Sequence, residues 1–293
     1  MATNFGRPQS APTSQLPIWR ELIDGRLEQL TPVPTSDCEQ LSLAWRHAAS
    51  APGKRIRGLL LLAVLDDLGQ PALAGLDYAC AVELTHTASL IIDDLPSMDD
   101  AKLRRGRATL HRKFGDSVAI LTAIAMLSKA FALAAAGGNA ATVTILARAI
   151  GTDGLVGGQL LDLLAPRTIA SAIAEAYSLK TSALFEAACQ MAATAAAADD
   201  IATEALTSFA RSVGVAFQIA DDALDGAETT IGSGKDVGID PPGSTLASLV
   251  GLSEAQRWRD LSVRSATSNL SVLSESRSIL AWLNLLFKPP ALP

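Results

Sequence analysis

Almost the whole chain reads as a series of helical segments. Apolar side chains recur with the helical period of 3.6 residues, and short Gly/Pro breaks such as Pro52-Gly53 interrupt them. Runs in which β-branched and polar residues alternate, the pattern of a strand, are almost absent. The expected helices span residues 16–30, 39–50, 54–68, 72–95, 116–136, 140–150, 153–164, 168–197, 199–227, 253–272 and 276–287. The sequence therefore predicts an all-α fold.

These helices are expected to form one domain. Length alone allows two domains, but no linker divides the chain and no repeat of fixed period is present. The helices expected at 72–95, 168–197 and 199–227 are long and apolar on most sides, as the centre of a bundle requires. Residues 1–15 mix Pro, Ser, Thr and Gln, which is typical of a disordered tail rather than a signal peptide. The prediction is a single helical domain over 16–293.

Composition argues against several other classes. With 24 Lys+Arg against 30 Asp+Glu, the net charge of −6 gives no broad basic field for nucleic acid. Cys38, Cys80 and Cys189 are odd in number and form no CxxC, so a disulfide framework is not expected and a reducing, cytoplasmic compartment is. Residues 118–136 are apolar enough to be considered as a membrane span, but they are rich in Ala and contain Lys129. A buried bundle helix fits that segment better.

Two acidic clusters interrupt otherwise apolar helices. The first contains Asp93, Asp94, Asp99 and Asp100, and the second contains Gln218, Asp221, Asp222 and Asp225. Members of the second cluster are spaced i, i+3, i+4 and i+7, so they share one helical face. In the first, Pro96 cannot continue a helix, so the chain should turn there and bring Asp99 back beside Asp93. His86, seven residues before Asp93, faces the same way.

One such cluster alone could equally be a solvated helix end. Two of them, each after an apolar run and each with a polar partner one or two turns earlier, favour a binding site. Facing carboxylates suit Mg²⁺, which takes one or two carboxylates per ion and is completed by substrate phosphates. The sequence therefore predicts magnesium and a polyphosphate ligand.

Basic residues accompany both clusters despite the negative net charge. The run from Lys102 to Lys113 follows the first cluster, and by itself it could be a surface loop paired with Asp99 and Asp100. That interpretation leaves other basic residues unexplained, namely Lys54, Arg55, Arg57, Lys180 and Lys235. Lys180 lies among Ala and Leu in mid-helix, where a lysine costs free energy unless an anion or a carboxylate compensates it. Together these residues predict a clamp for two anionic substrates.

From about Lys54 to Thr245 the chain resembles the trans-isoprenyl diphosphate synthases, or polyprenyl synthetases. The motifs that carry the resemblance are Gly53-Lys54-Arg55-Ile56-Arg57, Asp93-Asp94 with Asp99 and Arg104-Arg105-Gly106, Lys180-Thr181, Phe217-Gln218, Asp221-Asp222 with Asp225, and Gly234-Lys235. Residues 83–109 look most like the bacterial carotenoid-type geranylgeranyl diphosphate synthases. The resemblance implies the isoprenoid synthase fold, a bundle of long helices around a central cavity, and a homodimer.

The resemblance also implies a role for each motif residue. The principal Mg²⁺ ligands would be Asp93, Asp99 and Asp221, supported by Asp94, Asp222 and Asp225, with three ions per site. The diphosphate of isopentenyl diphosphate would be held by Lys54, Arg57, His86 and Arg105. The allylic diphosphate would be held by Arg104, Lys180 and Lys235, positioned by Thr181 and Gln218. A segment that packs helices near the site is matched by Gly157, Gly158, Gln159 and Asp162, where Gln159 is either a core polar group or a substrate contact.

The implied reaction joins isopentenyl diphosphate to dimethylallyl, geranyl or farnesyl diphosphate and ends at geranylgeranyl diphosphate. Metal ions and basic side chains neutralise the departing diphosphate, an allylic cation forms, the isopentenyl double bond attacks it, and loss of a proton restores an alkene. No side-chain nucleophile is needed, and no convincing Ser/His/Asp or Cys/His grouping is present. His47 and His111 are expected to be surface or structural residues.

Product length is expected to depend on the residues below the first acidic cluster. Ser89 and Ala88, four and five residues before Asp93, are both small and would leave room for twenty carbons. In the family a bulky aromatic residue at the position of Ala88 stops growth at fifteen. Around a helix Ser89 lies about 40° from Asp93 and Ala88 about 140°, so geometry supports Ser89 more firmly. We expect Ala88→Tyr or Ala88→Phe to shift the product to farnesyl diphosphate.

Three positions depart from the family pattern. Gly58 and Ala108 stand where proline is usual, and Gly243 stands where many relatives carry a lysine that contacts diphosphate. The tail 276–293 carries no recognisable motif. The alternatives are a farnesyl or longer-chain synthase, or a weakly active partner subunit of a heteromeric synthase. A terpene cyclase also uses an aspartate motif and Mg²⁺, but it does not require the second diphosphate site formed by Lys54, Arg57, His86 and Arg105.

Overall fold

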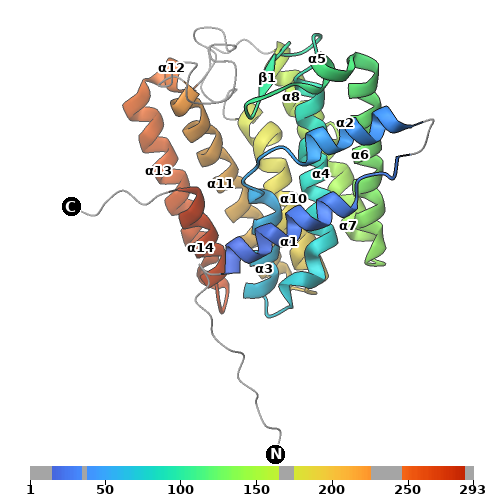
Figure 1. Ribbon diagram of the computed structural model, residues 1–293. Coiled ribbons are helices and arrows are strands. Elements are labelled where there is room, and N and C mark those ends of the chain that lie inside the picture. The colour runs from blue at the N-terminus through green and yellow to red at the C-terminus, as the bar shows by residue number, and fades with distance from the viewer. Residues whose placement is uncertain (1–14, 35–37, 165–174, 226–245, 288–293) are drawn as a thin grey trace, which may run out of the picture.

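The computed structural model describes residues 15–34, 38–164, 175–225 and 246–287, which are almost entirely helical (Figure 1). The α-helices are α1 (Gln15–Gln29), α2 (Glu39–Ala49), α3 (Ile56–Asp67), α4 (Leu76–Asp93), α5 (Leu110–Phe114), α6 (Asp116–Ala136), α7 (Ala140–Ile150), α8 (Leu155–Leu164), α10 (Ala183–Ala195), α11 (Asp200–Asp225), α12 (Leu246–Val250), α13 (Leu252–Asn269) and α14 (Arg277–Leu286). Short 3₁₀ turns are η2 (Ala72–Gly75) and η4 (Leu270–Val272), and η3 (Ser178–Ser182) is a turn of π-helix. The prediction of an all-α fold is confirmed.

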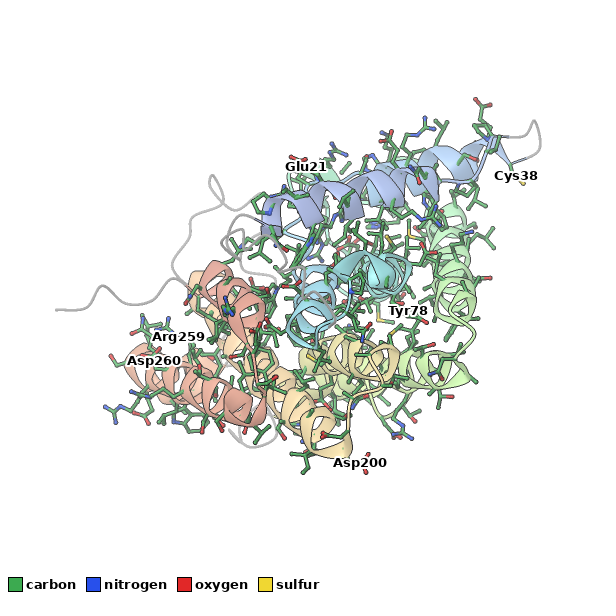
Figure 2. All side chains as sticks on the ribbon, turned by 90° about the horizontal axis from the view of Figure 1, so that it is seen from below. Glu21, Cys38, Tyr78, Asp200, Arg259 and Asp260 are labelled. Atoms are coloured by element: carbon green, nitrogen blue, oxygen red, sulfur yellow. The ribbon has the colours of Figure 1, made fainter. Side chains whose placement is uncertain are left out.

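The most buried helix is α3, which is shorter than the helices expected at the centre. Its residues 56–65 are all buried, and the run of Leu, Ala and Val over 59–65 is apolar around its whole circumference. Helices α4, α10 and α14 pack around it. Seen from below (Figure 2), α3 and α4 lie inside the bundle, between α1 and α2 on one side and α10 on the other. One large hydrophobic core thus joins residues of α1 to residues of α14, and a smaller separate cluster contains Tyr177, Ile219, Leu246 and Ala255.

Helix α6 contains residues 118–136, the segment that is apolar enough to be considered as a possible membrane span. Among the described residues it is the one helix long and apolar enough to cross a membrane by length and composition, with 39% of its most apolar window buried. It packs along α4 and also contacts α2, α5 and α7. The inner face of α6 therefore belongs to the core of the bundle, as the sequence predicts.

A small β-hairpin between α4 and α5 was not predicted. Strands β1 (Leu103–Arg104) and β2 (Arg107–Ala108) pair antiparallel around a two-residue turn, Arg105-Gly106, in which both residues have positive φ (54° and 73°). Such turns match the twist of a hairpin. Because the next ladder bond runs from Thr109 N–H to the Lys102 carbonyl, 3.1 Å, the N–H of Ala108 lies in a non-hydrogen-bonded pair. Alanine in place of the usual proline therefore leaves the ladder unchanged.

Candidate active site

The first acidic cluster is shaped by the turn that ends α4. The helix stops at Asp93, and the chain reverses so that the N–H of Asp99 donates to the Asp93 carbonyl at 3.0 Å. The N–H of Asp100 returns in the same way to Leu95, also at 3.0 Å. The prediction that Pro96 turns the chain and brings Asp99 back beside Asp93 is confirmed.

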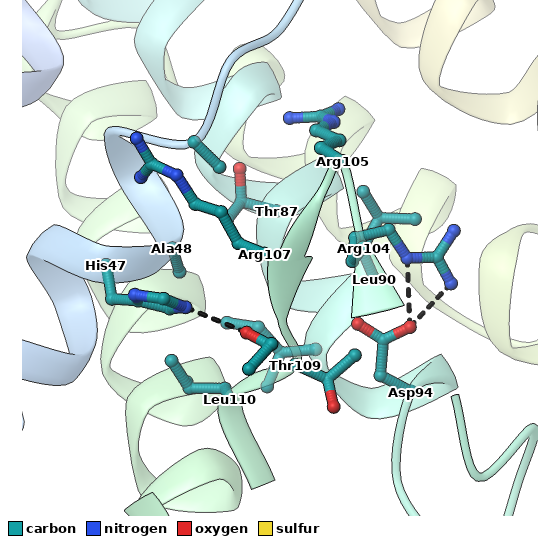
Figure 3. A pocket seen from close by; sticks show the side chains of 13 residues that line it. His47, Ala48, Thr87, Leu90, Asp94, Arg104, Arg105, Arg107, Thr109 and Leu110 are labelled. Atoms are coloured by element: carbon teal, nitrogen blue, oxygen red, sulfur yellow. Dashed lines mark hydrogen bonds and ion pairs between the residues drawn. The ribbon is translucent and has the colours of Figure 1, made fainter. Parts of the chain in front are cut away.

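The two aspartates at the end of α4 have different environments. Asp94 is 4% exposed, and one of its carboxylate oxygens accepts from Nε and Nη2 of Arg104 at 2.9 and 2.5 Å (Figure 3). Burial raises the pKa of Asp93 to about 6, although Lys180 opposes the shift. Asp94 is thus neutralised by a fixed partner, whereas Asp93 is a half-buried carboxylate that a bound cation would stabilise.

The pocket in Figure 3 lies between α2, α4 and the hairpin. One wall is His47, whose Nε2 bonds to the Ala108 carbonyl at 2.8 Å. In the picture Arg104 turns toward Asp94, whereas Arg105, the next residue, points away from it. The hairpin therefore separates two neighbouring arginines, as expected if they bind different diphosphates.

A second group of cations surrounds the start of α3. Arg57 is 7% exposed, and burial lowers its pKa to about 10 while Glu83 opposes that shift. Burial, and then the charges of Arg57, Arg105, Arg104 and Arg55, hold the pKa of His86 well below its usual range. His86 is therefore neutral near pH 7 and would bind an anion by donating a hydrogen bond rather than through charge.

The two basic residues of the loop before α3 have different environments. Arg55 has a positive φ of 50° and is 6% exposed, and its guanidinium bonds to Asp24 at 2.7 Å and to the Ala49 carbonyl at 2.7 Å. Lys54 is exposed. Arg55 is therefore occupied within the fold, which leaves Lys54 available as the loop's ligand-binding cation.

Glu83 is a buried carboxylate that sequence analysis did not assign. It is 3% exposed on α4 and accepts the N–H of Gly58 at 2.8 Å. That N–H belongs to the first turn of α3, where helical donors lack partners. A proline at this position would have no N–H to donate. The departure at Gly58 therefore gives Glu83 a hydrogen bond beside Arg57. An acidic residue inside an apolar helix was the signal that could have identified it.

The π-turn η3 connects the two acidic clusters. Lys180 bonds to Asp162 of α8 at 2.8 Å, and Asp93, Asp162 and Asp99 together outweigh the effect of burial and raise its pKa. The next residue, Thr181, donates to Gln218 of α11 at 2.7 Å. Turns of π-helix are frequent at functional sites. The predicted compensation of Lys180 by carboxylates is thus present.

Asp222 of the second cluster is buried within a hydrogen-bond network. It accepts from Gln218 at 2.8 Å and from the Tyr177 hydroxyl, which itself accepts the N–H of Leu246 at 3.1 Å. Tyr177 belongs to none of the predicted site residues, although it stands three residues before Lys180 on the same helical run. Asp222 is thus held from two sides and fixes this end of α11.

Two glycines allow neighbouring helices to approach η3 from opposite sides. A Cβ at Gly158 of α8 would lie 2.7 Å from Lys180 Cα, and a Cβ at Gly214 of α11 would lie 2.6 Å from Ser182 Cβ. Real Cβ atoms do not approach so closely. The predicted helix-packing role of the Gly157-Gly158 segment is therefore explained by backbone contact with the turn that carries Lys180.

Gly158→Ala is expected to lower the free energy of unfolding by about 1–3 kcal/mol, because the added methyl must displace the backbone of η3. Urea denaturation measures the change. Gly25→Ala is the matched control: Gly25 also lies in a helix, but a Cβ at that position would have nothing within 4 Å, so the substitution should be neutral or slightly stabilising. Equal effects of the two substitutions would contradict the close approach.

The predicted Mg²⁺ ligands supply the chemistry that this ion requires. Among the described residues, no three His, Cys, Asp or Glu side chains come together as a complete metal site. Magnesium normally takes only one or two carboxylates from a protein and completes its shell with water and substrate phosphates. Asp93, whose pKa burial raises to about 6, is a hard oxygen ligand that gains from a nearby cation. The carboxylates present therefore fit the ion.

Three expected positions lie outside the described part of the chain, and two others are described in detail. The side chain of Asp225 and the residues Lys235 and Gly243 are not described. Both amide atoms of Gln159 are buried without a hydrogen-bond partner in the described ranges, so a satisfied core group is not observed. His111 is 6% exposed with its Nε2 3.7 Å from Asp100, which agrees with a structural role.

Comparison with known proteins agrees with this site. Residues 38–253 match the family model described as polyprenyl synthetase. The chain is 43% identical over 273 residues to a geranylgeranyl diphosphate synthase of Pseudescherichia vulneris, covering 89% of this chain and 87% of that protein. It is 47% identical over 240 residues to one of Pantoea ananas, covering 78% of each.

Among solved structures, the chain resembles a geranyltransferase from Helicobacter pylori complexed with magnesium and isoprenyl diphosphate. The TM-score is 0.85 at 27% sequence identity, and the match covers 97% of this chain and all of that one. The similarity therefore extends over the bundle and beyond the span of the family model.

Proposed function

The chain belongs to the polyprenyl synthetase family, and from this premise we propose that it condenses isopentenyl diphosphate with allylic diphosphates to form geranylgeranyl diphosphate. Two relatives at 43% and 47% identity bear the name of that activity. The Helicobacter pylori structure with magnesium and isoprenyl diphosphate supports Mg²⁺ as the metal.

The observation that carries the proposal is the position of Lys180. Its ammonium is bonded to Asp162 and lies within the electrostatic influence of Asp93 and Asp99, while the adjacent Thr181 is bonded to Gln218 beside the second acidic cluster. A cation set between two acidic walls is what a diphosphate shared by metal ions on both walls requires.

The allylic diphosphate would lie between the acidic walls, held by Lys180. Asp93, Asp99 and Asp221 would hold magnesium, which neutralises charge on the leaving diphosphate when it is bound. Isopentenyl diphosphate would lie against Arg57, Arg105, Lys54 and neutral His86. With both head groups fixed, the two reacting carbons are held at bonding distance and the apolar helices exclude water from the cation.

The test is an assay of the purified protein with Mg²⁺, isopentenyl diphosphate and each allylic starter in turn, with the products separated by chromatography. Geranylgeranyl diphosphate as the main product supports the proposal. A main product of fifteen carbons, or of more than twenty, would identify a farnesyl or longer-chain synthase. Activity that needs a second protein would identify a partner subunit, and a cyclic hydrocarbon formed without isopentenyl diphosphate would identify a cyclase.

Substitutions at Ser89 and Ala88 of α4 test which residues limit the length of the product. Ser89 is half-buried and its hydroxyl donates to the His86 carbonyl at 2.9 Å, whereas Ala88 has no exposed surface and belongs to the core. Ser89→Phe is therefore expected to shift the product to farnesyl diphosphate with little loss of stability. Ala88→Phe should shift it too, but with about 1–3 kcal/mol of destabilisation from overpacking. If both variants still form the twenty-carbon product, neither Ser89 nor Ala88 lines the pocket that limits product length.

The outer face of α6 supports a homodimer. An exposed stripe without a charge runs along this helix and consists of Ser117, Leu121, Ile124, Ser128, Ala132 and Ala135. A second copy of this chain is the occupant that we propose, because two such stripes of small and apolar residues can pack closely.

Ile124→Glu should convert the dimer to a monomer, as measured by light scattering during gel filtration, because the buried carboxylate would be unpaired. Ile18→Glu on α1 is the matched control, since both isoleucines are 56% exposed. A monomeric wild-type protein, or a dimer that survives Ile124→Glu, would contradict this interface.

A further inference from the structure

The C-terminal helix α14 has no role in the sequence motifs. It begins at Arg277, beyond the last residue matched by the family model, and the tail from 276 onward carries no motif. In the structure α14 packs along α3, the helix whose first turn carries Arg57. Contacts at both ends of α3 link this helix to Arg57.

At its C-terminal end, α3 caps the start of α14. The carboxylate of Asp67 accepts the N–H groups of Ser278 and Ile279 at 3.0 and 2.8 Å, and the Ser278 hydroxyl donates to Asp66 at 2.7 Å. The N-cap residue of α14, Ser276, makes no side-chain cap of its own. Since the first turn of a helix leaves its N–H groups without partners, Asp67 satisfies donors that would otherwise be buried unpaired.

At the N-terminal end of α3, one tryptophan of α14 donates a hydrogen bond to the backbone of α3. Trp282 has no exposed surface, and its Nε1 donates to the carbonyl of Ile56 at 2.7 Å. Ile56 is the first residue of α3 and precedes Arg57. Helix α14 therefore holds both ends of α3, through contacts between residues more than 200 positions apart.

The same tryptophan supports the ring on which Arg57 rests. Trp282 meets Phe185 of α10 edge-on, with ring centroids 5.9 Å apart. The guanidinium carbon of Arg57 lies 4.7 Å from the centre of the Phe185 ring. The Nε of Arg57 is buried and has no hydrogen-bond partner in the described ranges. Arg57 is thus held by stacking, a geometry that leaves the guanidinium edge for a ligand.

We propose that α14 is a positioning element for the isopentenyl diphosphate site, in which Trp282 fixes both the backbone before Arg57 and the Phe185 ring beneath its guanidinium. The inference rests on the proposed function, because it assigns Arg57 to that diphosphate. It differs from ordinary core packing in one respect: disturbing Trp282 should weaken the binding of isopentenyl diphosphate and leave that of the allylic substrate unchanged.

Trp282→Phe tests the inference, because it keeps an aromatic ring and removes the N–H. Titration calorimetry with isopentenyl diphosphate alone should show a rise in Kd of up to about fivefold, because the lost hydrogen bond contributes at most about 1 kcal/mol to holding Arg57 in its binding position. The KM for the allylic substrate should stay within about twofold of the wild type. Trp45→Phe is the matched control: Trp45 is 2% exposed and its Nε1 has no partner in the described ranges, so neither constant should change.

Phe185→Leu is the second variant and removes the ring beneath Arg57. It should raise the Kd for isopentenyl diphosphate by a similar factor, and it decides alone if Trp282→Phe does not fold. Wild-type affinity in folded Phe185→Leu, or equal weakening for both substrates, would overturn the positioning role. Failure of the wild-type protein to bind isopentenyl diphosphate would instead overturn the proposed function, so the two failures are distinguishable.

Discussion

Asp93→Asn is expected to lower the rate of condensation at saturating substrates by about a thousandfold. Asp93 is the last residue of α4, the turn after it brings the N–H of Asp99 to its backbone carbonyl, and its carboxylate interacts electrostatically with Lys180. Desolvation raises its pKa to about 6, so in an assay at about pH 8 it is ionised and presents a partly desolvated negative charge. An amide of the same shape keeps the packing but loses the charge that would hold magnesium.

The measurement is the initial rate with saturating isopentenyl diphosphate and farnesyl diphosphate at several Mg²⁺ concentrations. Asp153→Asn, at an exposed position before α8, is the control and should retain full activity. The Asp93 variant should also unfold at no lower urea concentration than the wild type, because it removes a carboxylate whose charged form burial disfavours. A rate within tenfold of the wild type would exclude Asp93 as a principal metal ligand.

The parts of this site that sequence predicts are those fixed by local geometry. Pro96 cannot continue α4, and the reversal that follows is observed as a hydrogen bond from Asp99 to Asp93. Gln218 and Asp222 are one turn apart on one helix, and their side chains are bonded at 2.8 Å. In both cases the relevant residues are close in sequence, so periodicity and the covalent limits of proline determine their relation.

The hairpin escaped prediction because its signals are short. Each strand has two residues, below the length at which alternation can be recognised, and its turn is Arg105-Gly106 rather than Asn-Gly or Asp-Gly. Arginine at positive φ is unusual. Arg105, which has this conformation, points away from Asp94 while Arg104 turns toward it (Figure 3), so a local irregularity coincides with the site.

Periodicity could not predict which particular residues of distant segments contact one another. Tyr177 reaches Asp222 across 45 positions, Glu83 reaches Gly58 across 25, and Trp282 reaches Ile56 across 226. No periodic pattern encodes such pairs, because each depends on which helices become neighbours. Each pair nevertheless acts on a predicted motif, so the motif residues are found from sequence while the groups that hold them are found only in the fold.

Arg57→Lys is the second substitution with a large expected effect. It should raise the KM for isopentenyl diphosphate by about a hundredfold, because lysine has no plane to stack on Phe185 and only a point charge in place of a guanidinium fork. The KM for the allylic substrate should change little. Arg107→Lys is the control, since Arg107 is exposed and its two bonds to Ser50 are long, at 3.4 Å each.

The pH dependence of that variant separates the loss of charge from the loss of shape. Burial lowers the pKa of Arg57 to about 10, so the wild-type guanidinium stays mostly protonated up to pH 9. A lysine starts from a lower pKa, and the same burial disfavours its charged form further. Since only the protonated amine attracts diphosphate, affinity for isopentenyl diphosphate should fall in Arg57→Lys as the pH rises from 7 to 9 and stay nearly constant in the wild type. If affinity depends on pH in the same way in the wild type and in Arg57→Lys, the side chain at position 57 does not contact the diphosphate.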